Sequence, residues 1–129
     1  MRPVFLDLGD VLEIHQDQIR RYGGASGVRD IGLLQSAIAM AQAGWRGEYF
    51  HSFPFEMAAA YLYHIARHHP FLDGNQRVGA TVMLVFLELN DVHVSLPNAR
   101  LVDLVMRVAK GKLGKPGIAA FLQQFAKGP

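Results

Sequence analysis

The most chemically distinctive part of the chain is the run 69–77, His-Pro-Phe-Leu-Asp-Gly-Asn-Gln-Arg. It brings an imidazole, a carboxylate, a glycine turn, an amide and a guanidinium into one short segment. An imidazole such as that of His69 is suited to take a proton from an attacking hydroxyl. A lone carboxylate beside bound phosphates, here Asp73, is a usual ligand of Mg²⁺. The run therefore predicts that this segment handles a nucleotide phosphate.

The residues after the carboxylate have the properties of an anion site. They follow a proline that ends one apolar helical segment, and they precede another such segment that starts at Asn75 or Gln76. The first N–H groups of a helix are unpaired and lie at the positive end of its dipole. We expect the N–H groups of Gly74, Asn75 and Gln76 to cradle a phosphate. Arg77 would add charge-assisted hydrogen bonds.

Each of these residues also has a purely structural explanation. Asp73 followed three positions later by Gln76 fits a capping box, which needs no metal. His69 alone fits a core histidine bonded to a backbone carbonyl, and Arg77 alone fits a solvated charge. The phosphate hypothesis rests on the joint occurrence of these residues. Without a phosphate site, a separate structural explanation would have to hold for each of them at the same time.

The segments that position this run are predicted to be helical, since apolar residues recur at helical spacing and no segment alternates like a strand. The expected helices are one from Leu8 that stops at Tyr22–Gly24, one capped by Asp30 that includes Ile38, one that follows Pro54 and ends at Pro70, one from Asn75 or Gln76 to about Asn90, and two marked by Leu101–Val108 and Ile118–Phe125. The fourth is apolar nearly all round, so we expect it to be the buried central helix. The glycine-punctuated, aromatic segment Gly44–Pro54 fits neither period and is predicted to be an irregular flap.

Length and composition set the class of protein. With 129 residues, 50% of them hydrophobic and 19% charged, the chain is expected to form one all-α domain over residues 1–129. A net charge of +2 is too small to indicate direct nucleic-acid binding. The absence of cysteine excludes disulfides and thiolate zinc sites and fits a reducing cytoplasm. The longest apolar stretch, Val78–Leu89, is too short to cross a bilayer, so no membrane partner is expected.

Two other patterns in the sequence have a structural explanation. His64, His68 and His69 have a helical spacing that can bring imidazoles to one face as metal ligands, but no cluster of carboxylates accompanies them. We therefore interpret them as surface or packing histidines. The lysine-containing segment Gly111–Gly117 lacks the residue order of a phosphate loop and follows a helix rather than a strand, so we interpret it as a connection.

The run 69–77 resembles the signature of the Fic/Doc superfamily, His-Pro-Phe-x-Asp/Glu-Gly-Asn-x-Arg. Upstream, Ile14-His15-x-x-x-Ile19, Tyr22-Gly23-Gly24, Gly27-Val28-Arg29-Asp30 and Leu33–Ala37 resemble the first two helices of its Doc (death-on-curing) branch. The resemblance covers roughly residues 4–125. It implies a compact domain of about six helices with the motif loop at the head of a central helix and a flap that docks a target segment.

The resemblance also implies roles for the residues of the motif. His69 would be the base that deprotonates a target hydroxyl, and Asp73 would hold Mg²⁺. Gly74 and Asn75 would form the anion nest, and Arg77 would grip the phosphates of ATP. Phe71 would anchor the loop in the core.

Two departures from the Fic pattern bear on the reaction. Fic enzymes transfer AMP, and their motif continues Gly-Asn-Gly-Arg-x-x-Arg, whereas this chain has Gln76 for the glycine and Ala80 for the second arginine. A side chain at Gln76 would crowd the place of an α-phosphate, and Ala80 cannot clamp a leaving pyrophosphate. Both favour the Doc branch, whose members bind ATP in the opposite direction, transfer its γ-phosphate to a threonine of elongation factor Tu and so arrest translation.

The Doc resemblance is itself incomplete, because Doc proteins usually have lysine at the position of Gln76. A slower kinase, or one with a different target, would be consistent with that loss of charge. The resemblance further implies a cognate antitoxin that inhibits in trans, since no Ser/Thr-x-x-x-Glu inhibitory helix is present. A Fic-type AMP transferase and a catalytically silent peptide-binding module remain as alternatives.

Overall fold

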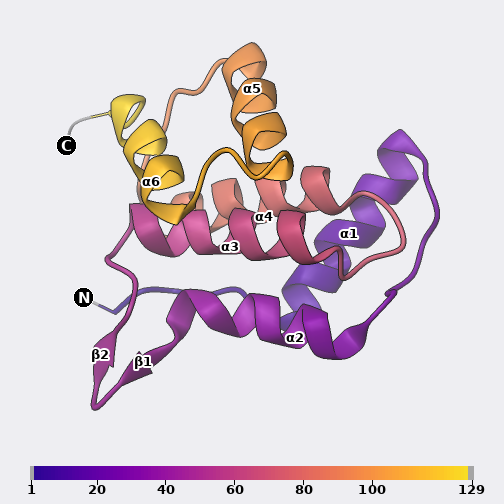
Figure 1. The fold of residues 1–129 in the computed structure, drawn as a ribbon, viewed down its shortest axis with the longest axis horizontal. Helices are drawn as coiled ribbons and strands as arrows, with labels where there is room; N and C mark the ends of the chain where they lie inside the picture. The colour runs from indigo at the N-terminus through magenta and orange to yellow at the C-terminus, as the bar shows by residue number, and fades with distance from the viewer. Residues whose placement is uncertain (1, 128–129) are drawn as a thin grey trace.

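In the computed structural model, which describes residues 2–127, the chain forms six α-helices, one short 3-10 helix and one small hairpin (Figure 1). The elements are α1 (Leu8–Tyr22), α2 (Ile31–Ala39), the 3-10 helix η1 (Met40–Gln42), β1 (Gly44–Trp45), β2 (Glu48–Tyr49), α3 (Phe55–His68), α4 (Asn75–Leu89), α5 (Asn98–Ala109) and α6 (Lys115–Gln124). The predicted all-α fold of about six helices is confirmed.

Local capping explains where the first two helices begin. Asp7 precedes α1 and accepts the N–H of Asp10 at 2.9 Å, while the Asp10 carboxylate accepts the N–H of Asp7 at 2.9 Å. This reciprocal pair is a capping box. Asp30 caps α2 by accepting the N–H of Leu33 at 3.0 Å, as the sequence predicts.

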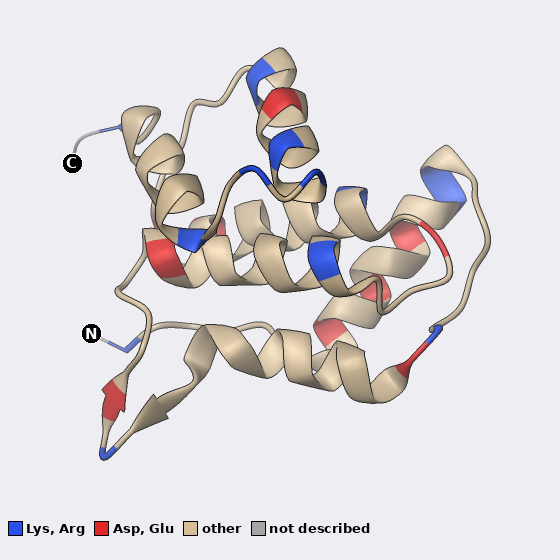
Figure 2. Cartoon of the chain, in the orientation of Figure 1, with Lys and Arg blue, Asp and Glu red and all other residues tan. Residues whose placement is uncertain are grey.

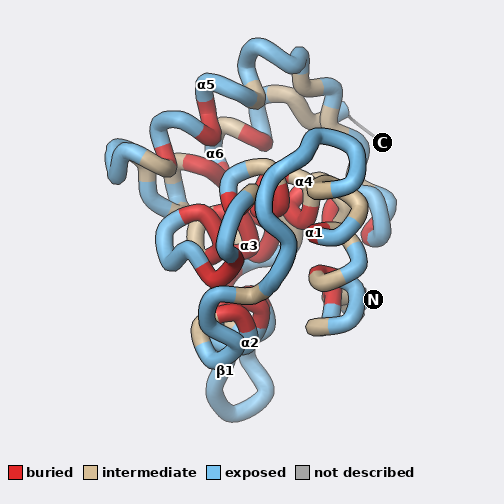
Figure 3. Tube along the Cα trace, turned by 90° about the vertical axis from the view of Figure 1, so that its right-hand side faces the viewer, coloured by how far each residue is buried: buried red, intermediate tan, exposed pale blue. Residues whose placement is uncertain are grey.

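The core is organised around the pair α3 and α4. Helix α3 packs against α4 and also against α2, α5 and α6. The run Met57–Leu62 of α3 is buried throughout, and α4 contributes Val78, Val82, Met83 and Phe86. Figure 3 shows this buried zone at the centre, with exposed chain around it. Although α4 is apolar, none of the helices within residues 2–127 is both long and apolar enough to cross a membrane.

The flap contains regular structure that the sequence does not reveal. Gly44 pairs with Tyr49 and Trp45 with Glu48 in an antiparallel hairpin, with Arg46 and Gly47 at positive φ in the turn. A Cβ at Gly44 would clash with the Glu48 carbonyl, so glycine is required there. The prediction of a wholly irregular flap is therefore wrong, because this segment contains a short hairpin. Strands of two residues are too short to show alternation along the sequence.

Charged side chains are dispersed over the surface (Figure 2). Several basic residues lie on α5 and on the connection to α6. There Arg107, Lys110 and Lys112 line one surface hollow together with Asp103. An ion pair joins Asp103 and Arg107 one helical turn apart, at 3.2 Å, in an exposed position. Such exposed pairs contribute little to stability.

Candidate active site at the start of α4

The motif run 69–77 spans the connection from α3 to α4 and the first turn of α4. Helix α3 ends at His68, and His69 adopts φ 50° and ψ 56°, which is the left-handed region. The predicted exit from helical geometry before Pro70 is confirmed, although the residue is left-handed rather than extended. This conformation is uncommon for a residue other than glycine. The His69 side chain is exposed, so its imidazole is accessible to a substrate.

Arg29 holds the end of α3 from the connection between α1 and α2. Its Nε donates to the carbonyl of His69 at 2.7 Å, and its Nη2 donates to the carbonyl of His68 at 2.9 Å. The N–H of Arg29 also donates to the carbonyl of Pro70 at 2.8 Å. Figure 1 shows the α1–α2 and α3–α4 connections at the same end of the molecule. In the sequence, Arg29 lies in a segment that resembles the Doc branch, but no role was predicted for it.

Asn75 closes the loop on itself. Its Oδ1 accepts the N–H of Phe71 at 2.9 Å, and its Nδ2 donates to the carbonyl of Phe71 at 3.1 Å. Phe71 is 1% exposed, so it lies in the core as expected of a loop anchor. The Asn75 side chain is therefore bonded to the backbone of Phe71. Only the backbone N–H of Asn75 is left to bind an anion at the start of α4.

Asp73 lies on the outer side of the loop and is exposed. Its Oδ1 accepts the N–H of Gly74 at 2.8 Å, and its Oδ2 accepts the N–H of Ala25 at 3.3 Å. A Cβ at Gly24 would lie 2.7 Å from Oδ2, so the glycine turn after α1 makes room for the carboxylate. The residue that precedes α4 is Gly74, at φ 78°, and no side chain caps the helix. The capping-box explanation of Asp73 and Gln76 is therefore wrong, because α4 begins one residue too late for it.

The first turn of α4 retains free backbone donors. The N–H of Gly74 donates to the Asp73 carboxylate and is not free. Within the described part of the chain, no hydrogen bond uses the N–H groups of Asn75, Gln76 or Arg77. These are the groups that a helix start offers to an anion. Two of the three N–H groups expected to form the nest are thus available, and that of Arg77 joins them.

The Arg77 side chain lies between the first turn of α4 and the end of α1. Its Nη2 donates to the carbonyl of Gly23 at 3.1 Å, and its guanidinium carbon lies 5.5 Å from the centre of the Tyr22 ring. The guanidinium also borders Gly74, where an added Cβ would lie 3.4 Å from Nη2. The cation is therefore held beside the expected phosphate site by α1.

A cleft of about 580 Å³ opens beside this first turn, between α4 and α5. Gln76, Arg77 and Ala80 line it from α4, and Leu101, Val105 and Met106 line it from α5. Ala80 is the position at which Fic enzymes carry their second arginine. The sequence indicated that a cation is missing there, and the structure shows that an open, largely apolar space adjoins that position.

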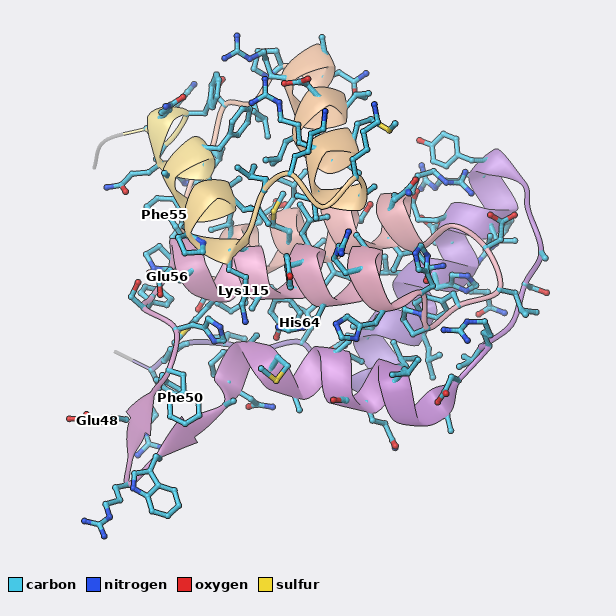
Figure 4. The ribbon with its side chains drawn as sticks, in the orientation of Figure 1. Glu48, Phe50, Phe55, Glu56, His64 and Lys115 are labelled. Atoms are coloured by element: carbon cyan, nitrogen blue, oxygen red, sulfur yellow. The ribbon has the colours of Figure 1, made fainter. Side chains whose placement is uncertain are left out.

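His64, in the middle of α3, belongs to a different site, shown in Figure 4. Lys115, from the start of α6, approaches His64 with Nζ 3.0 Å from Nε2. Burial, followed by the Lys115 charge, lowers the pKa of His64 to about 4. Burial also lowers the pKa of Lys115. We call Lys115, His64, His51 and Glu56 the lysine cluster.

The other members of the lysine cluster lie at the base of the flap. Burial and then the Lys115 charge lower the pKa of His51, and its Nδ1 is buried without a hydrogen-bond partner. Glu56 accepts the N–H of Ser52 at 3.1 Å. Across residues 2–127, no three His, Cys, Asp or Glu side chains come together as a metal site.

Comparison with known proteins gives consistent matches. The model of the Fic/DOC family matches residues 5–87. The "Protein kinase doc" of Escherichia phage P1 is 33% identical over 115 residues, which cover 89% of this chain and 90% of that protein. The "Toxin Doc" of Mycolicibacterium smegmatis (strain ATCC 700084 / mc(2)155) is 36% identical over 124 residues, covering 95% of this chain and 93% of that protein.

Proposed function

The chain belongs to the Fic/Doc family, and from this membership we propose that it is a Doc-like toxin that transfers the γ-phosphate of ATP to a protein hydroxyl. The names of its relatives, a protein kinase and a toxin, support this activity class. The observation that carries the proposal is the arrangement at the start of α4. An exposed imidazole at His69 belongs to the same short connection as free backbone donors at the start of α4, and an apolar cleft opens beside those donors.

In the proposed reaction, His69 takes the proton from the target hydroxyl as that oxygen attacks the γ-phosphorus. The bond between the γ-phosphorus and the β,γ-bridging oxygen breaks, and ADP leaves with the electron pair of that bond. The N–H groups of Asn75, Gln76 and Arg77 stabilise the charge on the transferring group, because they are fixed before the reaction begins.

Asp73 fits the role of Mg²⁺ ligand by the chemistry of its oxygens. Each carboxylate oxygen accepts one backbone N–H and keeps acceptor capacity toward solvent. A single carboxylate suits Mg²⁺, which keeps most of its waters and takes further ligands from phosphates. When bound, the ion would neutralise charge on the phosphate oxygens.

The cleft favours the kinase direction of ATP binding. A nucleotide whose γ-phosphate lies on the first turn of α4 can extend its base and ribose into the apolar space beside Ala80. In the opposite direction that space would receive a pyrophosphate, and Ala80 supplies no cation for it. We therefore expect Ala80→Arg to fill the cleft and weaken ATP binding about tenfold or more, measured by calorimetry. Unchanged ATP affinity in this variant would contradict the proposed direction.

The proposed target is a threonine of elongation factor Tu, which implies arrest of translation in the cytoplasm. The exposed flap is suited to dock an extended target segment by backbone pairing. Trp45 and Phe50 are 68% and 66% exposed on this flap, and such aromatic side chains commonly anchor interfaces. A cognate antitoxin that inhibits in trans would complete a toxin–antitoxin pair.

The proposal is tested by incubating the chain with Mg²⁺, elongation factor Tu and ATP labelled on either the α- or the γ-phosphate. Label arriving from the γ-phosphate alone, and lost in His69→Ala, is the expected result. Label arriving from the α-phosphate would instead show AMP transfer. The absence of any His69-dependent modification, together with retained binding of a partner peptide, would favour a silent binding module.

A further inference from the structure

We propose that His15 of α1 is a positioning residue of this site. It fixes the backbone of Asp73 and thereby the direction of the carboxylate that would hold Mg²⁺. The inference rests on the proposed function, since it concerns the same loop.

His15 lies directly beneath the motif loop. It is 4% exposed, and its ring stacks on that of Phe71 with 3.9 Å between centroids and 5° between planes. Its Nε2 lies 3.0 Å from the backbone carbonyl of Asp73. A carbonyl can only accept a hydrogen bond, so Nε2 carries the proton in this contact. One buried side chain therefore holds both Phe71 and Asp73.

The contact is informative because, within residues 2–127, no other hydrogen bond reaches the backbone of Asp73. Leu72 is 57% exposed and does not anchor the loop in the core, although its N–H donates to the carbonyl of Gly27 at 3.1 Å. The Asp73 side chain is short and is oriented by Gly74 and Ala25. A displacement of the Asp73 backbone would therefore carry the carboxylate with it.

Space filling alone does not explain a histidine at this position. An aromatic hydrocarbon ring would stack on Phe71 equally well, and burying an imidazole is unfavourable unless its polar atoms are bonded. The donor at Nε2 is thus the property that distinguishes His15 from phenylalanine here. Groups that orient a metal ligand commonly affect metal affinity about 10- to 100-fold when they are removed.

Two substitutions separate the stacking from the hydrogen bond. His15→Phe keeps a flat ring beneath Phe71 but removes the donor, whereas His15→Gln keeps an amide donor and removes the ring. The binding of a non-hydrolysable ATP analogue is measured by calorimetry with Mg²⁺ and again with EDTA. His93→Phe, at an exposed position between α4 and α5, is the matched control.

We expect His15→Phe to weaken Mg²⁺-dependent binding about tenfold. The affinity of His15→Phe for the analogue in EDTA should equal that of wild type. The Mg²⁺-dependent affinity of His15→Gln should lie between those of His15→Phe and wild type. In an Asp73→Asn background, His15→Phe should cause no further loss, because its effect passes through Asp73. An equal loss with and without Mg²⁺, or no loss in a folded variant, would overturn the proposal. So would a wild-type protein whose nucleotide affinity is independent of Mg²⁺.

This measurement does not depend on catalysis. If wild-type protein transfers no phosphate but shows the expected binding pattern, the proposed function fails while the role of His15 stands. If transfer occurs and His15→Phe leaves the Mg²⁺ dependence unchanged, the role of His15 fails alone. Should His15→Phe not fold, His15→Leu, which also lacks a donor, is compared with His15→Gln in both Asp73 backgrounds.

Discussion

Helix α3 carries two polar sites that differ in how their groups are used. At its C-terminal end, His69 is exposed, and its backbone is held by Arg29. Nearer its middle, His64 is partly buried against Lys115, and burial keeps its pKa near 4. The first site leaves an imidazole and backbone donors open to solvent. In the second, the Lys115 amine and the His64 ring bond to each other.

The difference shows that a perturbed pKa alone does not locate the candidate active site of this protein. The largest lowering of a histidine pKa reports burial beside a cation at the junction of α3 and α6. The motif loop is identified instead by geometry, through a left-handed His69 and unpaired N–H groups next to a cleft. We therefore interpret the lysine cluster as a packing feature and the loop as the reactive site.

The substitution with the largest expected effect is His69→Ala. Loss of the base should lower phosphate transfer at least about 100-fold. The melting temperature should stay close to that of wild type, because the side chain is exposed. Both are measured on the same preparation, by γ-phosphate labelling and by calorimetry. Substantial transfer by His69→Ala would remove the distinction between the two sites of α3.

Asn75→Ala should come next, mainly through stability. It leaves two backbone groups of buried Phe71 unpaired, which we expect to lower the free energy of unfolding by about 2 kcal/mol. Urea denaturation measures this change. Asn98→Ala, at the exposed first position of α5, is the matched control and should be nearly neutral. Equal losses in the two variants would contradict the role of Asn75 in closing the loop.

The lysine cluster predicts a loss of stability in acid. The pKa of His64 is about 4 in the folded protein, whereas its ordinary value is 6.5, so the unfolded chain binds more protons between these values. The free energy of unfolding should therefore fall as pH falls from about 6.5 to about 4, by about 1–2 kcal/mol after allowance for partial exposure. His51 acts in the same direction.

This acid effect is measured by urea denaturation at several pH values. His64→Gln keeps an acceptor for Lys115 but cannot titrate, so it should make the decline shallower. A decline of unchanged slope in His64→Gln would show that other groups cause it.

Arg29→Lys should have a smaller effect on transfer than His69→Ala. Lysine cannot reproduce the fork that bonds the carbonyls of His68 and His69 at once. Losing one such bond is worth about 1 kcal/mol, which corresponds to about a fivefold lower rate if the loss is felt in the transition state. Steady-state kinetics measure it, with Arg21→Lys, an exposed arginine on α1, as control. Equal rates in the two variants would exclude this role for Arg29.

Lys115→Met should have the smallest effect on transfer, because Lys115 belongs to the other site. Removing its charge should raise the pKa of His64, since that charge lowers it in the native protein. Histidine NMR titration follows the pKa, and labelling follows the reaction. A large loss of transfer in a folded Lys115→Met protein would link the two sites and contradict the comparison.

The sequence by itself determined the helices, the flap segment and the chemistry of the motif run. Helical periodicity, the Asp30 cap and the effect of Pro70 on His69 act over a few neighbouring residues, so they are visible in the order of the amino acids. The hairpin was missed because two-residue strands have no period. Whether Asp73 caps a helix also stayed open until the start of α4 was known.

The tertiary structure alone decided which side chains support that run. His15 meets Asp73 across 58 positions of sequence, and His64 meets Lys115 across 51. Arg29 meets His69 across 40. These partners depend on how α1, α3 and α6 pack, and packing depends on the burial of whole helical faces rather than on local spacing. The candidate reactive groups are therefore encoded in one short run, whereas their orientation comes from the packing of distant helices.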